Sequence, residues 1–249
     1  MSENQSILLE KGLDQVLKSI GLVKDEITFL IDNGYEDYLD VMNEKFSYSK
    51  TFLHRENNLK FKEIFFPISV INHKRRKINY SEILNFFNHK TKCTSIIGEA
   101  GSGKSMLAKH IFLNSLKKDF RIPILIELRN FNNEDISFNE KVHRILNNNN
   151  LAPNILIFNR LLKKGKFIFI LDGFDEINTS VKSQLVNDID SFIDKFNDNY
   201  FIITSRYNSG LNSIPRFENH YIKSLTKKQI DEYIDVQCYL LNDNELAIK

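Results

Sequence analysis

A glycine-rich stretch near the middle of the chain has the spacing of a phosphate-binding loop. In GEAGSGKS, residues 98–105, the residues Gly98, Gly103, Lys104 and Ser105 satisfy the pattern G-x-x-x-x-G-K-[ST]. Glycines allow the backbone to curl so that successive N–H groups point at phosphate oxygens. The lysine brings a compact charge to the β- and γ-phosphates, and the serine hydroxyl can bind Mg²⁺. The whole loop is therefore the predicted nucleotide-binding segment: Gly98, Glu99, Ala100, Gly101, Ser102, Gly103, Lys104 and Ser105.

A cluster of carboxylates follows a buried apolar run. Residues 167–171 are all apolar, and Asp172, Asp175 and Glu176 come soon after them. Crowded carboxylates at a strand end repel one another and are costly to desolvate, so a cation is expected beside them. Magnesium bound to the phosphates and to Ser105 supplies that charge. We therefore predict that Asp172 faces the magnesium, through a coordinated water.

The two acids after Asp172 are candidates for the general base. Either Asp175 or Glu176 lies close enough to polarise a water aimed at the γ-phosphate, and the longer reach of Glu176 favours it. The sequence leaves the choice open. A third polar group, Arg206, ends the apolar strand FIITSR. Because ligands of open α/β folds bind at the carboxyl ends of the strands, we expect Arg206 to contact the γ-phosphate.

Strands and helices alternate around these clusters. Apolar, β-branched runs predict strands at residues 93–97, 122–128, 167–171 and 200–205, with a short fifth strand at 220–225. Helix-length segments separate them, which indicates right-handed crossovers and a parallel sheet. The predicted fold class is α/β, with a five-stranded parallel sheet flanked by helices and with the phosphate-binding loop at its carboxyl edge.

The remaining segments suggest three regions. Helical stripes of apolar residues recur over 9–20 and 27–42, so residues 1–60 are predicted to be a small N-terminal helical segment. Residues 61–224 form the nucleotide-binding domain, which opens with an edge strand or extended segment at 61–71 and a helix at 80–89. Thr226 and Gln229 fit a capping box. Residues 225–249 are therefore predicted to be the first helix of a further helical region, truncated here.

Composition limits the alternatives. The chain has 249 residues, 42% of them apolar, and a formal net charge of +2, so neither nucleic acid nor an anionic membrane is favoured as a partner. Cys93 and Cys238 are far apart, and the six histidines are scattered, so no disulfide framework or zinc site is indicated. No signal peptide or long apolar run is present, which favours the cytoplasm. The basic run at 73–77 is typical of a solvated face.

Four segments together resemble one family. GEAGSGKS, PILIELRNF, FILDGFDEI and FIITSR are similar to the motifs of the NACHT family, which are P-loop NTPases of the STAND type. The most specific feature is the pair Asp172 and Gly173 followed by Asp175 and Glu176. The segment FFPISV, residues 65–70, resembles the one that enters the adenine pocket of this family. The resemblance covers about residues 61–235.

This resemblance implies a signal-transducing switch. Family members bind and slowly hydrolyse ATP with Mg²⁺, return to an ADP-bound resting form, and self-associate into oligomers once a sensor region detects a trigger. Bacterial members are associated with innate immunity against phage, so a phage-derived protein is a candidate trigger. The family generally continues with helical, winged-helix and sensor regions. The resemblance therefore implies that this chain is a fragment or that another chain does the sensing.

Two other functions remain open at this point. A P-loop kinase acting on a small molecule or nucleotide would need an acceptor pocket and an arginine-rich lid, but residues 130–160 are rich in asparagine and contain only Arg144 and Arg160. A non-catalytic scaffold would bind nucleotide without hydrolysing it. Retention of Asp172, Asp175 and Glu176 argues against that alternative.

Overall fold

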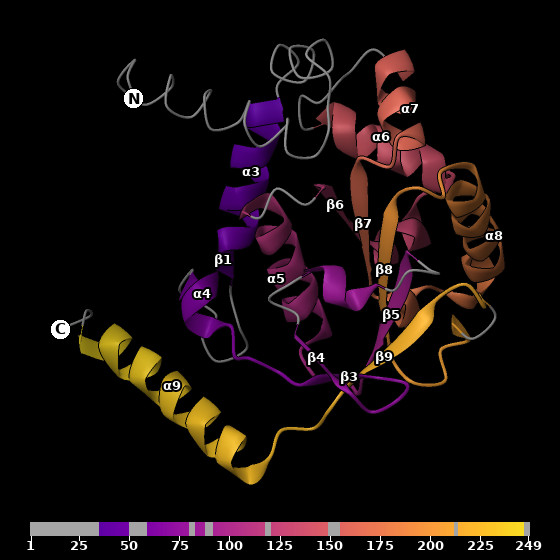
Figure 1. Ribbon diagram of the computed structural model, residues 1–249. Coiled ribbons are helices and arrows are strands. Elements are labelled where there is room, and N and C mark those ends of the chain that lie inside the picture. The colour runs from indigo at the N-terminus through magenta and orange to yellow at the C-terminus, as the bar shows by residue number, and fades with distance from the viewer. Residues whose placement is uncertain are drawn as a thin grey trace, which may run out of the picture.

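The computed structural model describes residues 35–49, 59–79, 83–87, 92–117, 121–148, 155–211 and 214–246. Its centre is a seven-stranded sheet with the strand order β4-β3-β9-β5-β8-β7-β6 (Figure 1). The strands are β3 (Val70–Asn72), β4 (Lys77–Ile78), β5 (Cys93–Ile97), β6 (Ile122–Glu127), β7 (Phe167–Asp172), β8 (Tyr200–Ser205) and β9 (Glu218–Ile222). The five strands from β9 to β6 are parallel, which confirms the predicted core. Strands β3 and β4 extend the sheet with antiparallel pairs.

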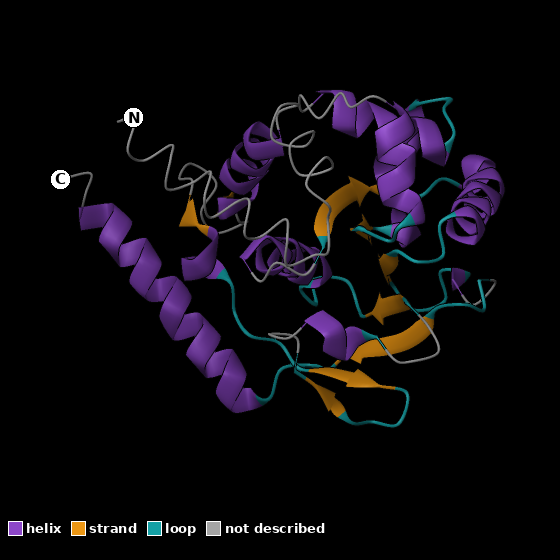
Figure 2. Cartoon of the chain, turned by 45° about the horizontal axis from the view of Figure 1, so that its top comes forward, coloured by secondary structure: helices purple, strands orange, loops and turns teal. Residues whose placement is uncertain are grey.

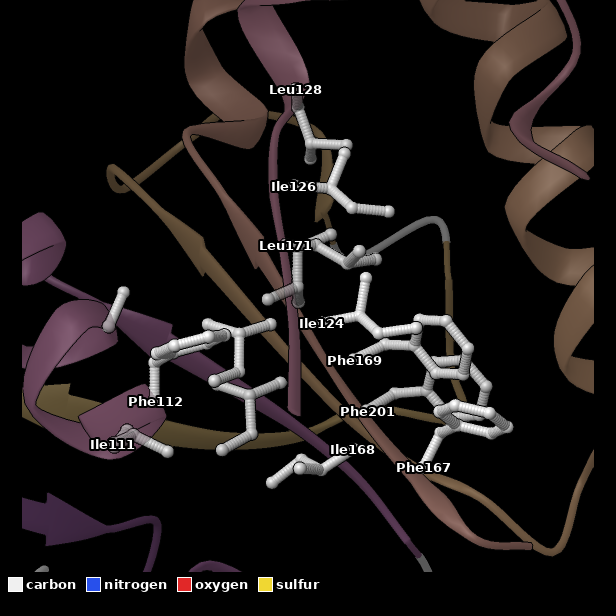
Figure 3. Close-up of a cluster of buried hydrophobic side chains, with 14 of the residues drawn as sticks. Ile111, Phe112, Ile124, Ile126, Leu128, Phe167, Ile168, Phe169, Leu171 and Phe201 are labelled. Atoms are coloured by element: carbon white, nitrogen blue, oxygen red, sulfur yellow. The ribbon is translucent and has the colours of Figure 1, made fainter. Parts of the chain in front are cut away.

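Aromatic side chains fill one face of the sheet. Phe169 of β7 stacks on Phe201 of β8 with ring centroids 5.1 Å apart. Phe192 of α8 (Thr179–Lys195) meets Phe169 edge to face at 5.3 Å, so this helix covers that face. On the other face lie Ile111 and Phe112, both fully buried, from α5 (Lys104–Lys117) (Figure 3). Continuous apolar strands are what a parallel sheet with helices on both faces requires.

The helices form layers on the two sides of the sheet (Figures 1 and 2). Helices α6 (Phe138–Asn148) and α7 (Ile155–Lys163) lie on the side of α8, and α3 (Tyr35–Ser47) lies beside α5. The hydroxyl of Tyr38 donates to the carbonyl of Pro123 at 2.6 Å, which fixes α3 to the start of β6. The predicted helix over 9–20 lies outside the described residues, and α3 is the described part of the second predicted helix.

The chain enters the sheet through an extended segment over 65–69, as one of the two sequence alternatives predicts, but the first four residues of the predicted segment, 61–64, form a helix. A two-stranded hairpin of β1 (Tyr48–Ser49) and β2 (Leu59–Lys60) leads into α4 (Phe61–Ile64) and an extended stretch over 65–69. Strand β3 then pairs with both β9 and β4, so it is not an edge strand. The basic run at 73–77 is exposed and comprises the turn between β3 and β4 together with Lys77, the first residue of β4.

The helix predicted over 80–89 is wrong where the structure describes it. Residues Ile83–Phe86 form a single 3-10 turn, η1. The Thr94 hydroxyl donates to the carbonyl of Phe86, and the Asn85 side chain donates to the carbonyl of Asn79 at 3.0 Å. The carbonyl at the end of the turn thus accepts from Thr94 of β5, and the Asn85 side chain bonds back to the chain before the turn, so both contacts favour a short turn over a longer helix.

The predicted capping box forms at the start of the last helix. The Thr226 N–H donates to Oε1 of Gln229 at 3.0 Å, and the Gln229 N–H donates to the Thr226 hydroxyl at 3.3 Å. Helix α9 (Lys227–Leu246) then runs away from the sheet (Figure 2). None of the helices among the described residues combines the length and apolarity needed to span a bilayer. The predicted domain boundaries at 60 and 224 stay predictions.

Candidate functional site

The glycine-rich loop joins the carboxyl end of β5 to the amino end of α5. The Gly98 N–H donates to the carbonyl of Ser205 at 3.1 Å, so the loop starts beside the end of β8. Gly103 has a φ of 88°, a left-handed conformation that side chains strain. Its carbonyl accepts the first helical bond, from Leu107 at 2.8 Å. The free N–H groups of a helix start and its dipole favour an anion at this position.

Lys104 directs its charge into the same loop. Its Nζ donates to the carbonyls of Gly98 and Glu99 at 2.9 and 2.7 Å. Burial lowers the pKa of Lys104 from 10.5, while the Asp175 carboxylate opposes this shift. Both hydrogen-bond partners are neutral, so the positive charge of Lys104 is available to an anion.

Asp172, the last residue of β7, is held by the neighbouring strand. The Thr204 hydroxyl of β8 donates to Oδ1 of Asp172 at 2.5 Å and accepts from the Gly173 N–H at 2.9 Å. One threonine thus fixes both the carboxylate and the backbone that follows it. Thr204 itself is fully buried, so these two bonds belong to the packed carboxyl end of the sheet.

Gly173 allows the chain to turn directly after Asp172. It has φ 83° and ψ 49° and precedes the 3-10 turn η3 (Phe174–Glu176), in which Phe174 is fully buried. A Cβ at Gly173 would lie 3.2 Å from Cδ and 3.3 Å from Oε1 of Glu176. The position therefore requires glycine for two reasons, the positive φ and the close side chain of Glu176. This explains the small residue in the acidic motif.

The structure separates the two candidate bases. Oδ2 of Asp175 forms an ion pair with Nε of Arg206 at 2.8 Å, and Oδ1 accepts from the Arg206 N–H at 3.0 Å. The side chain of Asp175 is 12% exposed and that of Glu176 is 43% exposed. Asp175 is thus engaged with Arg206, whereas Glu176 presents its carboxylate at the surface of the site.

The three sequence clusters meet in one cavity. A cavity of about 300 Å³ is lined by loop and helix residues 100–106 together with Asp175, Glu176 and Arg206. Asp172 does not line this cavity, but it lies close enough to Lys104 for its carboxylate to oppose the lowering of the pKa of that lysine by burial. The fold thus gathers the predicted residues around the cavity, with Gly98, Glu99 and Asp172 outside its lining. Their individual roles stay predictions.

A second cavity, of about 580 Å³, adjoins the first. Both share the loop wall from Ala100 to Gly103, and the second is otherwise mostly apolar, with Phe66, Ile68, Met106 and Tyr233 among its lining residues. Phe66 and Tyr233 meet edge to face at 5.5 Å. An apolar, aromatic cavity next to a phosphate site suits a nucleobase. The sequence pointed to residues 65–70 here but missed Tyr233, which reads only as part of the apolar stripe of α9.

The oxygen donors at the site fit magnesium. Within the described ranges, no group of three or more His, Cys, Asp or Glu side chains is arranged to hold a metal ion. A metal here would therefore depend on phosphate oxygens in addition to protein ligands. Ser105 and Asp172 offer a hydroxyl and a carboxylate, which are hard oxygen ligands of the type that Mg²⁺ takes beside phosphates.

Sequence reasoning gave no site role to the segment that follows β6, although the family-like motif PILIELRNF ends in it. Glu127 is the register partner of Asp172 in the parallel pair of β6 and β7, so it ends its strand at the same edge. The next segment is the 3-10 helix η2 (Leu128–Asn133), whose Arg129 and Asn132 contact the acidic turn. The available signal was positional, because polar residues after any strand of a parallel sheet gather at its carboxyl edge.

Comparison with known proteins gives a family match and, among others, the following weaker likenesses. The family model of the NACHT domain matches residues 92–240. An uncharacterized WD repeat-containing protein of Nostoc sp. is 32% identical over 104 residues, which cover 37% of this chain and only 7% of that protein. The solved structure of C. elegans PCH-2 shares 14% identity, covering 55% of this chain and 37% of that one. Its TM-score of 0.30 is too low to carry an argument.

Proposed function

Because the chain belongs to the NACHT domain family, a group of STAND-type P-loop NTPases, we propose that it is an ATP-binding and slowly ATP-hydrolysing switch that depends on Mg²⁺. The observation that carries the proposal is the single cavity in which the phosphate-binding loop faces Asp175, Glu176 and Arg206. A triphosphate, a metal and an attacking water all need to meet within such a space.

One nucleotide spans the two adjoining cavities. Its phosphates lie on the N–H groups of residues 98–105 and beside the ammonium of Lys104, and its base enters the apolar cavity between Phe66 and Met106. The shared loop wall places the base of ATP or ADP on one side of the glycine-rich turn and the phosphates on the other. The same site can therefore hold both nucleotides, which differ only in the γ-phosphate.

Ser105 and Asp172 would hold the magnesium. When bound, the ion neutralises charge on the phosphates. The protein's part is to keep the two oxygen donors in place. Thr204 does this for Asp172, because its hydrogen bond fixes one carboxylate oxygen and leaves the other for a coordinated water.

Glu176 is assigned as the general base. Its carboxylate takes the proton of the water whose oxygen attacks the γ-phosphorus, while the bond from the γ-phosphorus to the β–γ bridging oxygen breaks and ADP leaves. Asp175 holds Arg206 at the rim of the cavity, at 2.8 Å. Arg206 is the γ-phosphate sensor in this scheme: it pairs with Asp175 alone when the γ-phosphate is absent and also contacts that phosphate when ATP is bound.

The biological role that we propose is the one that the family resemblance supports. The ATP form self-associates after a trigger is sensed, in bacterial innate immunity against phage, with a phage-derived protein as candidate trigger and the cytoplasm as the setting. The matched Nostoc protein carries WD repeats by its name, and a repeat region of that kind in a longer chain or a partner is a suitable sensor. Nucleic acid and membrane surfaces are not proposed as partners.

The kinase alternative is weaker. Over the described parts of 130–160, the chain forms η2, α6 and the first part of α7, and Arg144 there pairs with Glu134 at 3.6 Å. These packed elements leave little of the segment to act as a mobile, arginine-rich lid.

Release of ADP from ATP and Mg²⁺ by the purified protein, with and without candidate acceptors, tests the proposal. We expect slow ADP release that is independent of acceptors and is lost in Lys104→Ala. Release that requires an acceptor would establish a kinase, and tight ATP binding with no ADP release would establish a scaffold.

A further inference from the structure

The segment η2 clamps the acidic turn from the side of β6. The side-chain amide of Asn132 donates to the main-chain carbonyl of Glu176 at 2.9 Å, and its Oδ1 accepts from the Asn178 N–H at 2.8 Å. One asparagine therefore holds the backbone on both sides of Ile177. The main chain at Glu176 is therefore fixed by a residue that lies more than forty positions away in the sequence.

Arg129 approaches the carboxylate of Glu176 and is itself anchored. Its Nη2 and Nε donate to Oε2 of Glu127 at 2.7 and 3.2 Å. Glu127 is the register partner of Asp172, so this anchor belongs to the sheet. With two nitrogens engaged, Nη1 of Arg129 lies 3.9 Å from Oε2 of Glu176. The rigid guanidinium fork makes such a bridge between two carboxylates possible.

Glu176 is thus limited on two sides. Its Cδ and Oε1 lie 3.2 and 3.3 Å from the position that a Cβ at residue 173 would take, so that only glycine leaves them room, and Arg129 faces its Oε2. A glutamate that is 43% exposed would otherwise sample several rotamers, and holding it in one rotamer removes that freedom before the reaction. Arg129 does not line either of the two cavities described above, so its effect on chemistry must pass through Glu176.

We propose that Arg129, anchored by Glu127, is a positioning residue that orients the Glu176 carboxylate toward the attacking water. Asn132 fixes the main chain beneath it. The inference rests on the proposed function and deepens it, because it names the contacts that make a half-exposed glutamate usable as a base. It predicts that Arg129 affects the hydrolysis step and leaves nucleotide binding almost unchanged.

The test is single-turnover ATP hydrolysis beside calorimetric ATP affinity. Arg129→Ala should slow hydrolysis roughly tenfold or more, the scale of a misplaced catalytic group, with ATP affinity changed less than about twofold. Arg129→Lys should recover part of the rate, because it keeps the charge but loses the fork. In the Glu176→Gln background, Arg129→Ala should slow hydrolysis no further, since both changes remove one function.

Arg144→Ala is the matched control. Arg144 is exposed to a similar degree, 57% against 60% for Arg129, and also pairs with a glutamate of the same region. Its removal should leave the hydrolysis rate unchanged. A full additional loss from Arg129→Ala in the Glu176→Gln background would overturn the positioning role, as would an unaltered rate in the single variant. A wild-type protein that binds ATP and never hydrolyses it would instead overturn the proposed function, and this inference with it.

Discussion

At the residue scale, we expect nucleotide binding to depend strongly on the ammonium of Lys104. It is partly buried and bonded to two neutral carbonyls, so its charge is oriented toward the phosphate position. Lys104→Ala should weaken ATP affinity by a factor of roughly ten to a hundred, the range for losing a charge-assisted hydrogen bond. The fold should persist, because the side chain adds little packing.

Isothermal calorimetry checks this prediction, and Lys109→Ala supplies the control. Lys109 lies on the same helix, but its Nζ faces the hydroxyl of Ser49 at 3.4 Å and lines neither cavity. Its removal should not change ATP affinity. Equal affinities for wild type and Lys104→Ala would refute the phosphate-binding assignment.

Gly173 offers a second prediction at this scale. An alanine there would have to adopt a φ of 83°, and its Cβ would clash with the carboxyl group of Glu176, so it should displace the Glu176 carboxylate. We expect Gly173→Ala to lower stability by about 1–3 kcal/mol and to slow hydrolysis strongly while ATP still binds. Gly210→Ala isolates the backbone effect, because Gly210 has φ 84° and an added Cβ would have nothing within 4 Å.

Thermal melting and single-turnover rates on this pair separate strain from contact. Both variants should melt at a lower temperature, and only Gly173→Ala should lose its hydrolysis rate. A similar loss of rate in both would mean that the clash of the added Cβ at residue 173 with Glu176 has no catalytic consequence.

At the element scale, β9 carries a buried histidine that makes the sheet sensitive to acid. Burial lowers the pKa of His220 from 6.5 to about 4, opposed by Glu218 and assisted by His73. Between these pH values the unfolded chain binds the proton more readily than the folded one. The contribution of neutral His220 to the free energy of unfolding is therefore fully present above pH 6.5. It is lost as the pH is lowered toward 4, by on the order of 3 kcal/mol.

Urea unfolding between pH 7 and pH 4 measures this effect. His220→Leu should flatten the profile over that interval, because the titrating group is gone. His73→Gln, at a residue whose side chain is 52% exposed, should keep most of the slope. If His220→Leu and wild type lose stability in parallel, acid acts on other groups.

The elements that the sequence predicts well are those that a local pattern defines. Strands β5 and β8 have the predicted bounds, because an unbroken apolar run can be buried only between helix layers. The 3-10 turn at Ile83–Phe86 was predicted as a helix, because its hydrogen bonds to Asn79 and Thr94 depend on tertiary placement. The antiparallel pairing of β3 was also unpredicted, since pairing partners are set by topology and not by composition.

The same distinction holds for the site. The residues of the loop, Asp172 and the acidic pair are visible as motifs. The ion pair of Arg206 with Asp175 and the approach of Arg129 to Glu176 are not, because each joins residues that follow different strands of the sheet. Spacing identified both candidate bases and the longer reach of Glu176 favoured it, but only the structure shows that Asp175 is engaged with Arg206.

At the scale of the whole molecule, the apolar cavity lies between the glycine-rich loop and α9. Tyr233 lines that cavity and meets Phe66, so a base bound there would contact the helix that leads away from the sheet. Tyr233→Ala should weaken ATP binding roughly tenfold by removing a stacking surface, and should leave binding of inorganic tripolyphosphate unchanged. Tyr239→Ala, on the same helix at 66% exposure, is the control. Calorimetry with both ligands decides, and equal losses for ATP and tripolyphosphate would contradict a base-specific contact.

The most direct test of the whole account compares two nearly isosteric substitutions by single-turnover hydrolysis of Mg²⁺-ATP, with size-exclusion chromatography alongside. Asp172→Asn should weaken magnesium-dependent ATP binding. Glu176→Gln should keep ATP bound, slow hydrolysis by roughly a hundredfold or more, and accumulate the ATP form, which elutes as a larger species if it self-associates. Normal hydrolysis by Glu176→Gln, whether or not Asp175→Asn is impaired, would contradict the assignment of Glu176 as the base on which the switch depends.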